Sequence, residues 1–314
     1  MAINKFMMAA LKALSYPDID VKKNYKIDRA INNLSKPKIK ILYKMWDHRI
    51  VLGDHVIPVR IFMPREQLGP ELLVFFHGGG WVSGNIDTYI KPCGNLANHV
   101  GRRVISVDYR LAPEFPFPHA VNDCYHAVKE LFKFCDIFDV SPDDVVLIGD
   151  SAGGNLAAVV SLMARDKGEF KIGRQILIYP AVYNNHTETS PFESVRTNGY
   201  EYLLTSKKIC DYMELYIQDK KYLNNPYFAP LLADDLSNQP KTLIITAEFD
   251  PLRDEGEEYG RQLRLAGGDV TIYRMMNGLH GFFSLPARFS HVKKSYKLIQ
   301  SFLGEVTYIE DGVE

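Results

Sequence analysis

The strongest constraint on the fold is a series of short apolar runs that alternate with segments of helical period. Each run has the length of a β-strand, is rich in β-branched and aromatic residues, and is bounded by Gly, Pro or Asp. Because the runs are almost continuously apolar, they are typical of strands in a parallel sheet that helices cover on both faces. We therefore predict an α/β fold. The runs are residues 72–76, 104–107, 145–148, 176–179, 243–246 and 270–273.

The segments between and before these runs add helices and a hairpin. Residues 120–132 place their apolar side chains on one helical face, whereas residues 156–164 are apolar almost all round and predict a buried helix. Upstream, residues 46–52 and 56–62 are strand-like runs separated by a Gly-Asp turn sequence. This pattern predicts an antiparallel hairpin at the edge of the sheet.

Two regions interrupt the alternation and predict a cap. One precedes the hairpin and has a helical pattern without strands; the other is a polar and aromatic insertion, too long for an ordinary loop. We expect most of its tyrosines to pack the insertion against the main domain. The predicted organisation is a cap segment at 1–45, a core at 46–181, a cap insertion at 182–226, a second core part at 227–303 and a tail at 304–314.

Charge and cysteine content narrow the class of ligand and compartment. The 314 residues include 37 Lys and Arg against 38 Asp and Glu, so no strong field attracts nucleic acid or anionic lipid. A small or neutral ligand fits this balance better. The four cysteines lack C-x-x-C spacing and are too few for a disulfide framework, which predicts free thiols.

The first residues have a superficial likeness to a signal peptide. Lys12 interrupts the apolar run of residues 6–14, and no A-x-A cleavage sequence follows, so we expect an amphipathic helix instead. No stretch reaches the roughly 18 uninterrupted apolar residues of a membrane span. We therefore expect a cytoplasmic protein without a membrane span.

A nucleophile motif follows the strand-like run at residues 145–148. Residues 149–153 read GDSAG, a G-x-S-x-G sequence between this run and the predicted buried helix. That is the strand–turn–helix context of a nucleophile elbow. Gly149 and Gly153 flank Ser151, where a tight turn crowds Cβ atoms against its neighbours. A glycine-rich turn without catalysis is the simpler alternative, but the placement favours Ser151 as a nucleophile.

Three consecutive glycines follow the run at residues 72–76. His77, Gly78, Gly79 and Gly80 form an HGGG sequence, whose backbone N–H groups no side chain can obstruct. This is the sequence of an oxyanion-hole loop in enzymes with a nucleophile elbow.

Two phosphate-binding alternatives for the same glycines fail. A dinucleotide fingerprint read from Gly78 would need Gly or Ala where Ser83 stands, and an acidic residue about 20 positions on, whereas Asp108 is nearer 30. A phosphate-binding P-loop would need Gly-Lys followed by Ser or Thr, which is absent.

An activated serine needs a base and an acid, which follow an elbow serine in the order acid, then histidine. Downstream of Ser151, His186 falls in the predicted cap and His291 on a helical face where a solvated residue is expected. His280 lies between Gly278 and Gly281, just after the last predicted strand, and is the best candidate for the base.

Asp250 is the best candidate for the acid because it closely follows the strand at residues 243–246. Asp254 competes with it, but its place just before a helical pattern is explained more simply by helix capping. Glu248 is a weaker competitor. Asp250 lies 99 residues after Ser151 and 30 before His280, which leaves room for one β-α unit between acid and base.

Five motifs carry a family resemblance. They are HGGG at 77–80, DYRLAPE at 108–114, GDSAGGN at 149–155, DPLRD at 250–254 and GLHGF at 278–282. Together they closely resemble the bacterial hormone-sensitive-lipase-like family of α/β-hydrolase carboxylesterases, over residues 46 to about 303. The GDSAG sequence looks like that of the Asp-containing subgroup.

The resemblance implies an α/β-hydrolase fold with a mostly parallel eight-stranded sheet and a helical cap. It also implies hydrolysis of short-to-medium acyl esters, with the amides of Gly79, Gly80 and Ala152 as oxyanion donors. Residues 109–114 look structural in the family. A Ser-His-Asp mechanism requires no metal or organic cofactor. We expect a small acyl ester as the partner and no nucleic acid, and a homodimer stays an open alternative.

Two other functions remain to be weighed against a general esterase. A deacetylase or amidase acting on acylated sugars or small natural products would use the same triad, and the cap geometry that separates them cannot be derived from the sequence. A ligand receptor on the same fold is known for members of the broader family that have lost the catalytic histidine. The presence of His280 argues against it.

Overall fold

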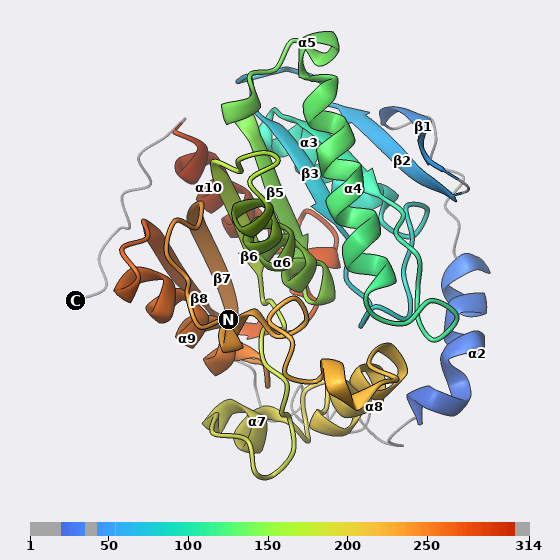
Figure 1. Ribbon diagram of the computed structural model, residues 1–314, viewed down its shortest axis with the longest axis vertical. Helices are drawn as coiled ribbons and strands as arrows, with labels where there is room; N and C mark the ends of the chain where they lie inside the picture. The colour runs from blue at the N-terminus through green and yellow to red at the C-terminus, as the bar shows by residue number, and fades with distance from the viewer. Residues whose placement is uncertain (1–19, 35–42, 54, 305–314) are drawn as a thin grey trace.

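The computed structural model describes residues 20–34, 43–53 and 55–304, and its centre is an eight-stranded sheet (Figure 1). The strand order is β1-β2-β4-β3-β5-β6-β7-β8. The β1–β2 and β2–β4 pairs are antiparallel and the others are parallel, so the predicted α/β fold with an edge hairpin is confirmed. The strands are β1 (Lys44–Leu52), β2 (His55–Met63), β3 (Leu72–Phe76), β4 (Arg103–Val107), β5 (Val145–Asp150), β6 (Arg174–Ile178), β7 (Lys241–Phe249) and β8 (Val270–Leu279).

Helices cover both faces of the sheet and form two apolar cores. Every residue of β3 and β5 is buried, as expected for strands between two helical layers. Helices α4, α6 and α9 pack on one face, and α3 and α10 on the other. Helix α6 is buried all round from Ala152 to Ala164, as the sequence predicted. The helices are α3 (Ile90–Val100), α4 (His119–Lys133), α5 (Cys135–Phe138), α6 (Ala152–Lys167), α9 (Arg253–Leu265) and α10 (Ser290–Leu303).

The register of the central strands brings the two glycine-rich motifs together. Phe76 at the end of β3 pairs with Gly149 in β5, and Asp150 pairs with Ile178 at the end of β6. Because parallel strands have their carboxyl ends at the same edge of a sheet, the loops that follow β3, β5, β6 and β7 all lie at this edge. The HGGG loop and the GDSAG turn are therefore neighbours.

The insertion and an N-terminal helix lie together beyond this edge (Figure 1). The backbone N–H of Val21 donates to Asp211 at 3.3 Å, and Lys22 pairs with Glu214 at 2.5 Å. Arg29 donates to the carbonyl of Val82 at 2.6 Å, which joins the same helix to the core. The amphipathic helix expected in the first residues lies outside the described part of the chain. The helices of this region are α2 (Val21–Leu34), α7 (Glu193–Asn198) and α8 (Ser206–Tyr216).

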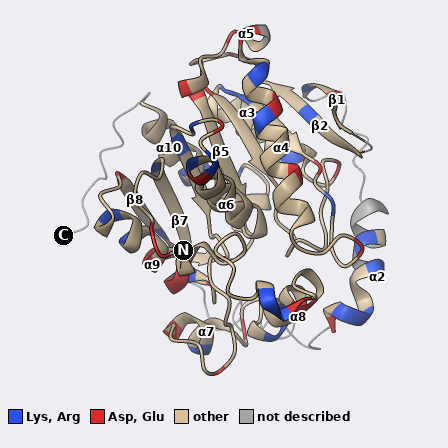
Figure 2. Cartoon of the chain, viewed as in Figure 1, with Lys and Arg blue, Asp and Glu red and all other residues tan. Residues whose placement is uncertain are grey.

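The predicted domain boundaries remain predictions. The first strand of the hairpin was expected at residues 46–52, and β1 pairs with β2 from Lys44 onward. Figure 2 shows acidic and basic residues spread over the outer helices in this view. None of the helices in the described ranges has the length and apolar character needed to cross a membrane.

Candidate active site

Ser151 lies on the sharp turn between β5 and α6. Its φ of 56° is a value that residues with a Cβ rarely adopt, and nucleophile elbows show this strain. A Cβ at Gly149 would lie 2.2 Å from the carbonyl oxygen of Gly153, and a Cβ at Gly153 would lie 2.0 Å from that of Phe76. Glycine at both positions therefore allows the turn to close against β3.

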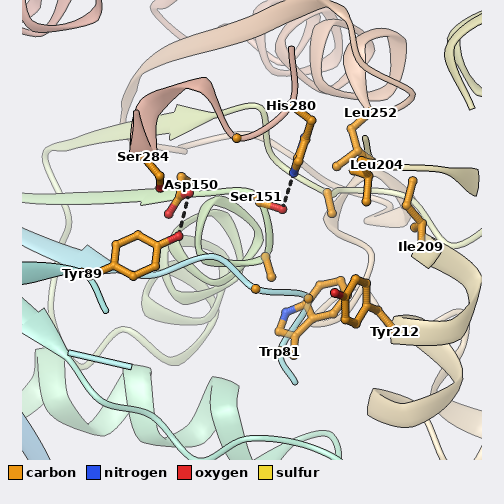
Figure 3. Close-up of a pocket in the computed structure, with 15 residues that line it drawn as sticks. Trp81, Tyr89, Asp150, Ser151, Leu204, Ile209, Tyr212, Leu252, His280 and Ser284 are labelled. Carbon is orange, nitrogen blue, oxygen red and sulfur yellow. Dashed lines mark hydrogen bonds between the residues drawn. The ribbon is translucent and has the colours of Figure 1, made fainter. Parts of the chain in front are cut away.

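His280 lies between Ser151 and Asp250. Its Nε2 is 2.9 Å from Ser151 Oγ (Figure 3), and its Nδ1 is 2.7 Å from Asp250 Oδ2. Asp250 is fully buried, and its Oδ1 accepts a hydrogen bond from the N–H of Leu252 at 2.9 Å. One carboxylate oxygen is thus held by the backbone while the other faces the imidazole. This arrangement orients a general base toward a hydroxyl group.

The register of β7 and β8 places Asp250 beside His280. Phe249 of β7 pairs with Leu279 of β8, so Asp250 and His280 are the next residues on two adjacent parallel strands. The sequence placed the end of the last strand near residue 273, but β8 continues to Leu279. The segment expected as a loop before His280 is therefore part of the strand.

The HGGG loop passes directly beside the elbow. Gly79 and Gly80 have φ values of 118° and 61°, which favour glycine. A Cβ at Gly79 would lie 2.2 Å from the carbonyl oxygen of Ser83, so this turn has no room for a side chain. Gly79, Gly80 and Ala152 all line the cavity that contains Ser151.

His77 supports this loop from the protein interior. It is fully buried, and burial lowers its pKa to about 4, so the ring is neutral near neutral pH. Its Nδ1 lies 2.8 Å from the carbonyl oxygen of Gly78. The ring of Tyr109 stacks on His77 at 4.2 Å between centroids, and the Tyr109 hydroxyl donates to the His77 carbonyl at 2.6 Å. Tyr109, from the DYRLAPE motif, is thus a structural support of the loop.

The cavity at Ser151 has a volume of about 200 Å³ and two unlike sides (Figure 3). Tyr89, Asp150 and Ser284 form a polar side, whereas the opposite side is apolar. Part of the apolar side comes from the predicted cap insertion, through α8 and the segment before it. The apolar lining consists of Trp81, Ala181, Leu204, Ile209, Tyr212 and Leu252.

Comparison with known proteins identifies the family. Residues 73–284 match the sequence model of the alpha/beta hydrolase fold family. The chain belongs to this family. It is 40% identical over 243 residues to the arylesterase of Saccharolobus solfataricus, which covers 76% of this chain and 77% of that protein. It is also 40% identical over 231 residues to the carboxylic ester hydrolase LipN of Mycobacterium tuberculosis, over 73% of this chain and 61% of LipN.

Solved structures of this alpha/beta hydrolase family share the architecture. A hyperthermophilic esterase from the archaeon Pyrobaculum calidifontis superposes with a TM-score of 0.82 at 35% identity, over 96% of this chain and 97% of that one. The predicted fold, family and enzyme class, a carboxylic ester hydrolase, are confirmed by these relatives. The Asp-containing subgroup remains a prediction.

Asp254 and Glu248, the two alternatives to Asp250, make other contacts in this hydrolase. Asp254 was expected to cap its own helix, but α9 begins at Arg253 and the Asp254 carboxylate instead accepts from the N–H of Ser194 in α7, at 2.7 Å. The expectation was wrong because α7 lies against this end of α9. Glu248 accepts from the N–H of Asn277 at 2.6 Å and so fastens β8.

The two other downstream histidines also lie away from Ser151. His186 is buried, with its Nε2 at 2.5 Å from the fully buried carboxylate of Glu255. His291, in the first turn of α10, places its Nε2 at 3.1 Å from the carbonyl oxygen of Met276. His291 is partly exposed, which approximately matches the expectation of a solvated side chain.

The tyrosines of the insertion divide between packing and the cavity. Tyr216 is fully buried and stacks on Trp81 at 4.8 Å, and Tyr222 packs on Phe117 at 5.1 Å. Tyr212 lines the cavity, where a Cβ at Gly80 would lie 2.4 Å from its ring. Packing therefore explains Tyr216 and Tyr222, whereas Tyr212 is part of the cavity wall near Ser151.

The cysteines show no disulfide, as predicted: all four are free. Within the described ranges, no cluster of three or more His, Cys, Asp or Glu side chains could hold a metal ion.

Sequence reasoning missed the polar side of the cavity. Asp150, the variable residue of the G-x-S-x-G motif, is buried and accepts a hydrogen bond from Tyr89 at 2.9 Å. An aspartate at the end of an otherwise apolar strand could have indicated a buried polar contact. Nothing in the pattern around Tyr89 or Ser284 pointed to the site.

Proposed function

We propose that this protein is a serine carboxylesterase that hydrolyses short-to-medium acyl esters through an acyl-enzyme on Ser151. The observation that carries the proposal is the hydrogen-bonded line from Ser151 Oγ through His280 to the buried Asp250. The names of the arylesterase and carboxylic ester hydrolase relatives support the same reaction class.

In the acylation step, Ser151 Oγ attacks the ester carbonyl carbon while its proton moves to His280 Nε2. Asp250 accepts the Nδ1–H of His280, which fixes the tautomer of the ring and stabilises the imidazolium. The amides of Gly79, Gly80 and Ala152 are the proposed donors to the tetrahedral oxyanion. The C–O bond to the alcohol then breaks, and His280 protonates the departing oxygen.

In the deacylation step, water takes the place of the alcohol. It attacks the acyl carbon as its proton moves to His280, and the second tetrahedral intermediate releases the acid by returning that proton to Ser151 Oγ. Each proton taken up by His280 is given back, so the enzyme ends the cycle unchanged.

The cavity supports a limit on acyl length. Leu204, Ile209 and Tyr212, from the proposed cap insertion at 182–226, close its apolar side. Each added methylene contributes about 0.8 kcal/mol only while it finds apolar wall to bury against. We therefore propose highest kcat/KM for acyl chains of roughly two to eight carbons.

The proposal is tested with p-nitrophenyl esters of increasing chain length beside a matched p-nitroanilide, on the wild type and the Ser151→Ala variant. Loss of the nucleophile is expected to lower kcat by about a million-fold, with the fold intact by circular dichroism. An S151A variant that keeps more than a few per cent of activity overturns the assignment. Faster hydrolysis of the anilide than of the ester identifies an amidase instead.

A further inference from the structure

The side chain of Asp150 has no part in the proposed reaction, yet it lies beside the reacting groups. It is 2% exposed, comes directly before Ser151 and lines the cavity (Figure 3). A buried carboxylate is costly unless hydrogen bonds satisfy it. Its partners therefore show what it holds.

The Asp150 carboxylate binds the backbone of the HGGG loop. Its Oδ1 accepts from the N–H of Gly78 at 2.9 Å, and its Oδ2 accepts from the hydroxyl of Tyr89 at 2.9 Å. A Cβ at Gly78 would lie 2.9 Å from the backbone oxygen of Asp150 and 3.0 Å from its Oδ2, so the loop touches the end of β5. Gly78 immediately precedes Gly79, one of the proposed oxyanion donors.

A second tyrosine extends this contact to the loop of the base. The hydroxyl of Tyr179 lies 3.4 Å from Asp150 Oδ2 and accepts from the N–H of Phe283 at 3.2 Å. The ring of Tyr179 lies 4.7 Å from that of His280. One carboxylate thus contacts, directly or through one tyrosine, the three segments that supply the proposed nucleophile, oxyanion donors and base.

We propose that Asp150 is a positioning residue: its ionised carboxylate holds the Gly78 amide, and with it the oxyanion loop, in place against the nucleophile elbow. A hydrogen bond to an ionised acceptor is shorter and about twice as strong as a neutral one. A loop displaced by a fraction of an ångström would lose oxyanion stabilisation without losing substrate binding. The inference rests on the proposed function, because it concerns the same oxyanion.

The surroundings of Asp150 make this role dependent on pH. Burial raises its pKa to about 6, while the hydrogen bonds from Tyr89 and Gly78 and the nearby His280 oppose that rise. Below this pH the carboxylate is protonated and its bond to Gly78 weakens. The titratable groups that face it are Tyr89, Cys93 of α3, Tyr109, Tyr179 and His280.

The test compares Asp150→Asn with wild type on p-nitrophenyl acetate. The variant keeps the size of the side chain but cannot ionise, so we expect kcat to fall about 10- to 100-fold and KM to change less than about threefold. On the acid side, protonation of Asp150 should lower the kcat/KM of the wild type by a similar factor below about pH 6, in addition to any fall that both enzymes share. The ratio of kcat/KM between wild type and variant should therefore shrink toward one as the pH is lowered.

Two further variants make the outcome decisive. Substitution of Asp143, an exposed residue before β5, by Asn should leave kcat and its dependence on pH unchanged. If D150N does not fold, Tyr89→Phe, which removes one donor to the same oxygen, should lower kcat in the same direction by a smaller factor. A D150N or Y89F enzyme with wild-type kcat, or a folded D150N enzyme whose kcat/KM stays in a constant ratio to that of the wild type as the pH is lowered, overturns the proposal.

Labelling with a fluorophosphonate separates this proposal from the proposed function. Wild type should be labelled at Ser151 and D150N labelled at the same residue, but about 10- to 100-fold more slowly. Absence of a label on wild-type Ser151 contradicts the proposed function itself. Equal labelling rates of wild type and D150N contradict only the role of Asp150.

Discussion

The carboxylate of Asp254 accepts a hydrogen bond at 2.7 Å from the backbone N–H of Ser194, 60 positions earlier in the chain. Ser194 lies in the first turn of α7, where unpaired N–H groups favour a negative charge. The Ser194 hydroxyl in turn donates to the carbonyl of Pro251 at 2.8 Å. These bonds fasten the insertion to the core directly beside Asp250.

The two neighbouring aspartates should therefore differ in phenotype. Asp250→Asn is expected to lower kcat about ten-thousand-fold, because the amide supports the wrong tautomer of His280. Asp254→Asn is expected to lower the free energy of unfolding by about 1 kcal/mol, with kcat within about tenfold of wild type. Ester kinetics and urea unfolding of both variants decide this, and exchanged phenotypes would show that Asp254 is the acid.

Glu255 forms a second attachment of the insertion. Its carboxylate is fully buried and accepts from the N–H of Val182 at 2.7 Å, while its other oxygen lies 2.5 Å from His186 Nε2. Glu255→Ala leaves these groups buried without a partner, so we expect the free energy of unfolding to fall by about 3 kcal/mol. Glu258→Ala, on the same helix and paired with Arg261, should change it by less than about 1 kcal/mol. Equal losses in urea unfolding would contradict the prediction.

The stability of the protein should depend on pH through Asp108. Burial raises its pKa to about 6, although its Oδ1 accepts from the N–H of Ile86 at 3.2 Å. The folded state therefore binds this proton more tightly than the unfolded chain, and the wild type loses stability as pH rises from about 4 to about 6.

Asp108→Asn should remove that loss and still accept from Ile86. Near pH 7.5 we expect the free energy of unfolding of the variant to be about 2 kcal/mol higher than that of the wild type. Near pH 4 the two values should differ little. Urea unfolding at the two pH values measures this difference. A variant that is no more stable at the higher pH would show that the Asp108 charge is not costly.

The sequence predicted the central part of the fold because local pattern and burial agree there. The run that became β5 is apolar because both faces are covered, and glycines flank Ser151 because a Cβ would collide with the backbone of Gly153 or Phe76. The end of β8 was missed because Asn277 and Gly278 favour turns. Pairing with β7 overrides that local preference.

Contacts between segments distant in the sequence could not be predicted. The contact of Asp254 with Ser194, and of Asp150 with Tyr89, depends on how the insertion and the turn before α3 lie against the core. No spacing or period along the chain encodes such a contact. That Ser151, Asp250 and His280 lie together could be predicted because strand ends and chain order restrict where each member of the proposed triad can occur.

The apolar side of the cavity gives a prediction about substrate length. Leu204 lines the cavity, so Leu204→Ala should open space for one or two more methylenes and raise kcat/KM for the longer esters relative to the acetate, by about fourfold for each methylene that gains contact. Leu215→Ala is the matched control, since Leu215 of α8 packs against the core and does not line the cavity. Both variants are compared with wild type on p-nitrophenyl esters whose acyl chains have about two to twelve carbons. This range is chosen because it spans the methylenes whose burial against the cavity wall can change. An unchanged preference in L204A, or the same shift in L215A, would mean that the insertion does not set the acyl length.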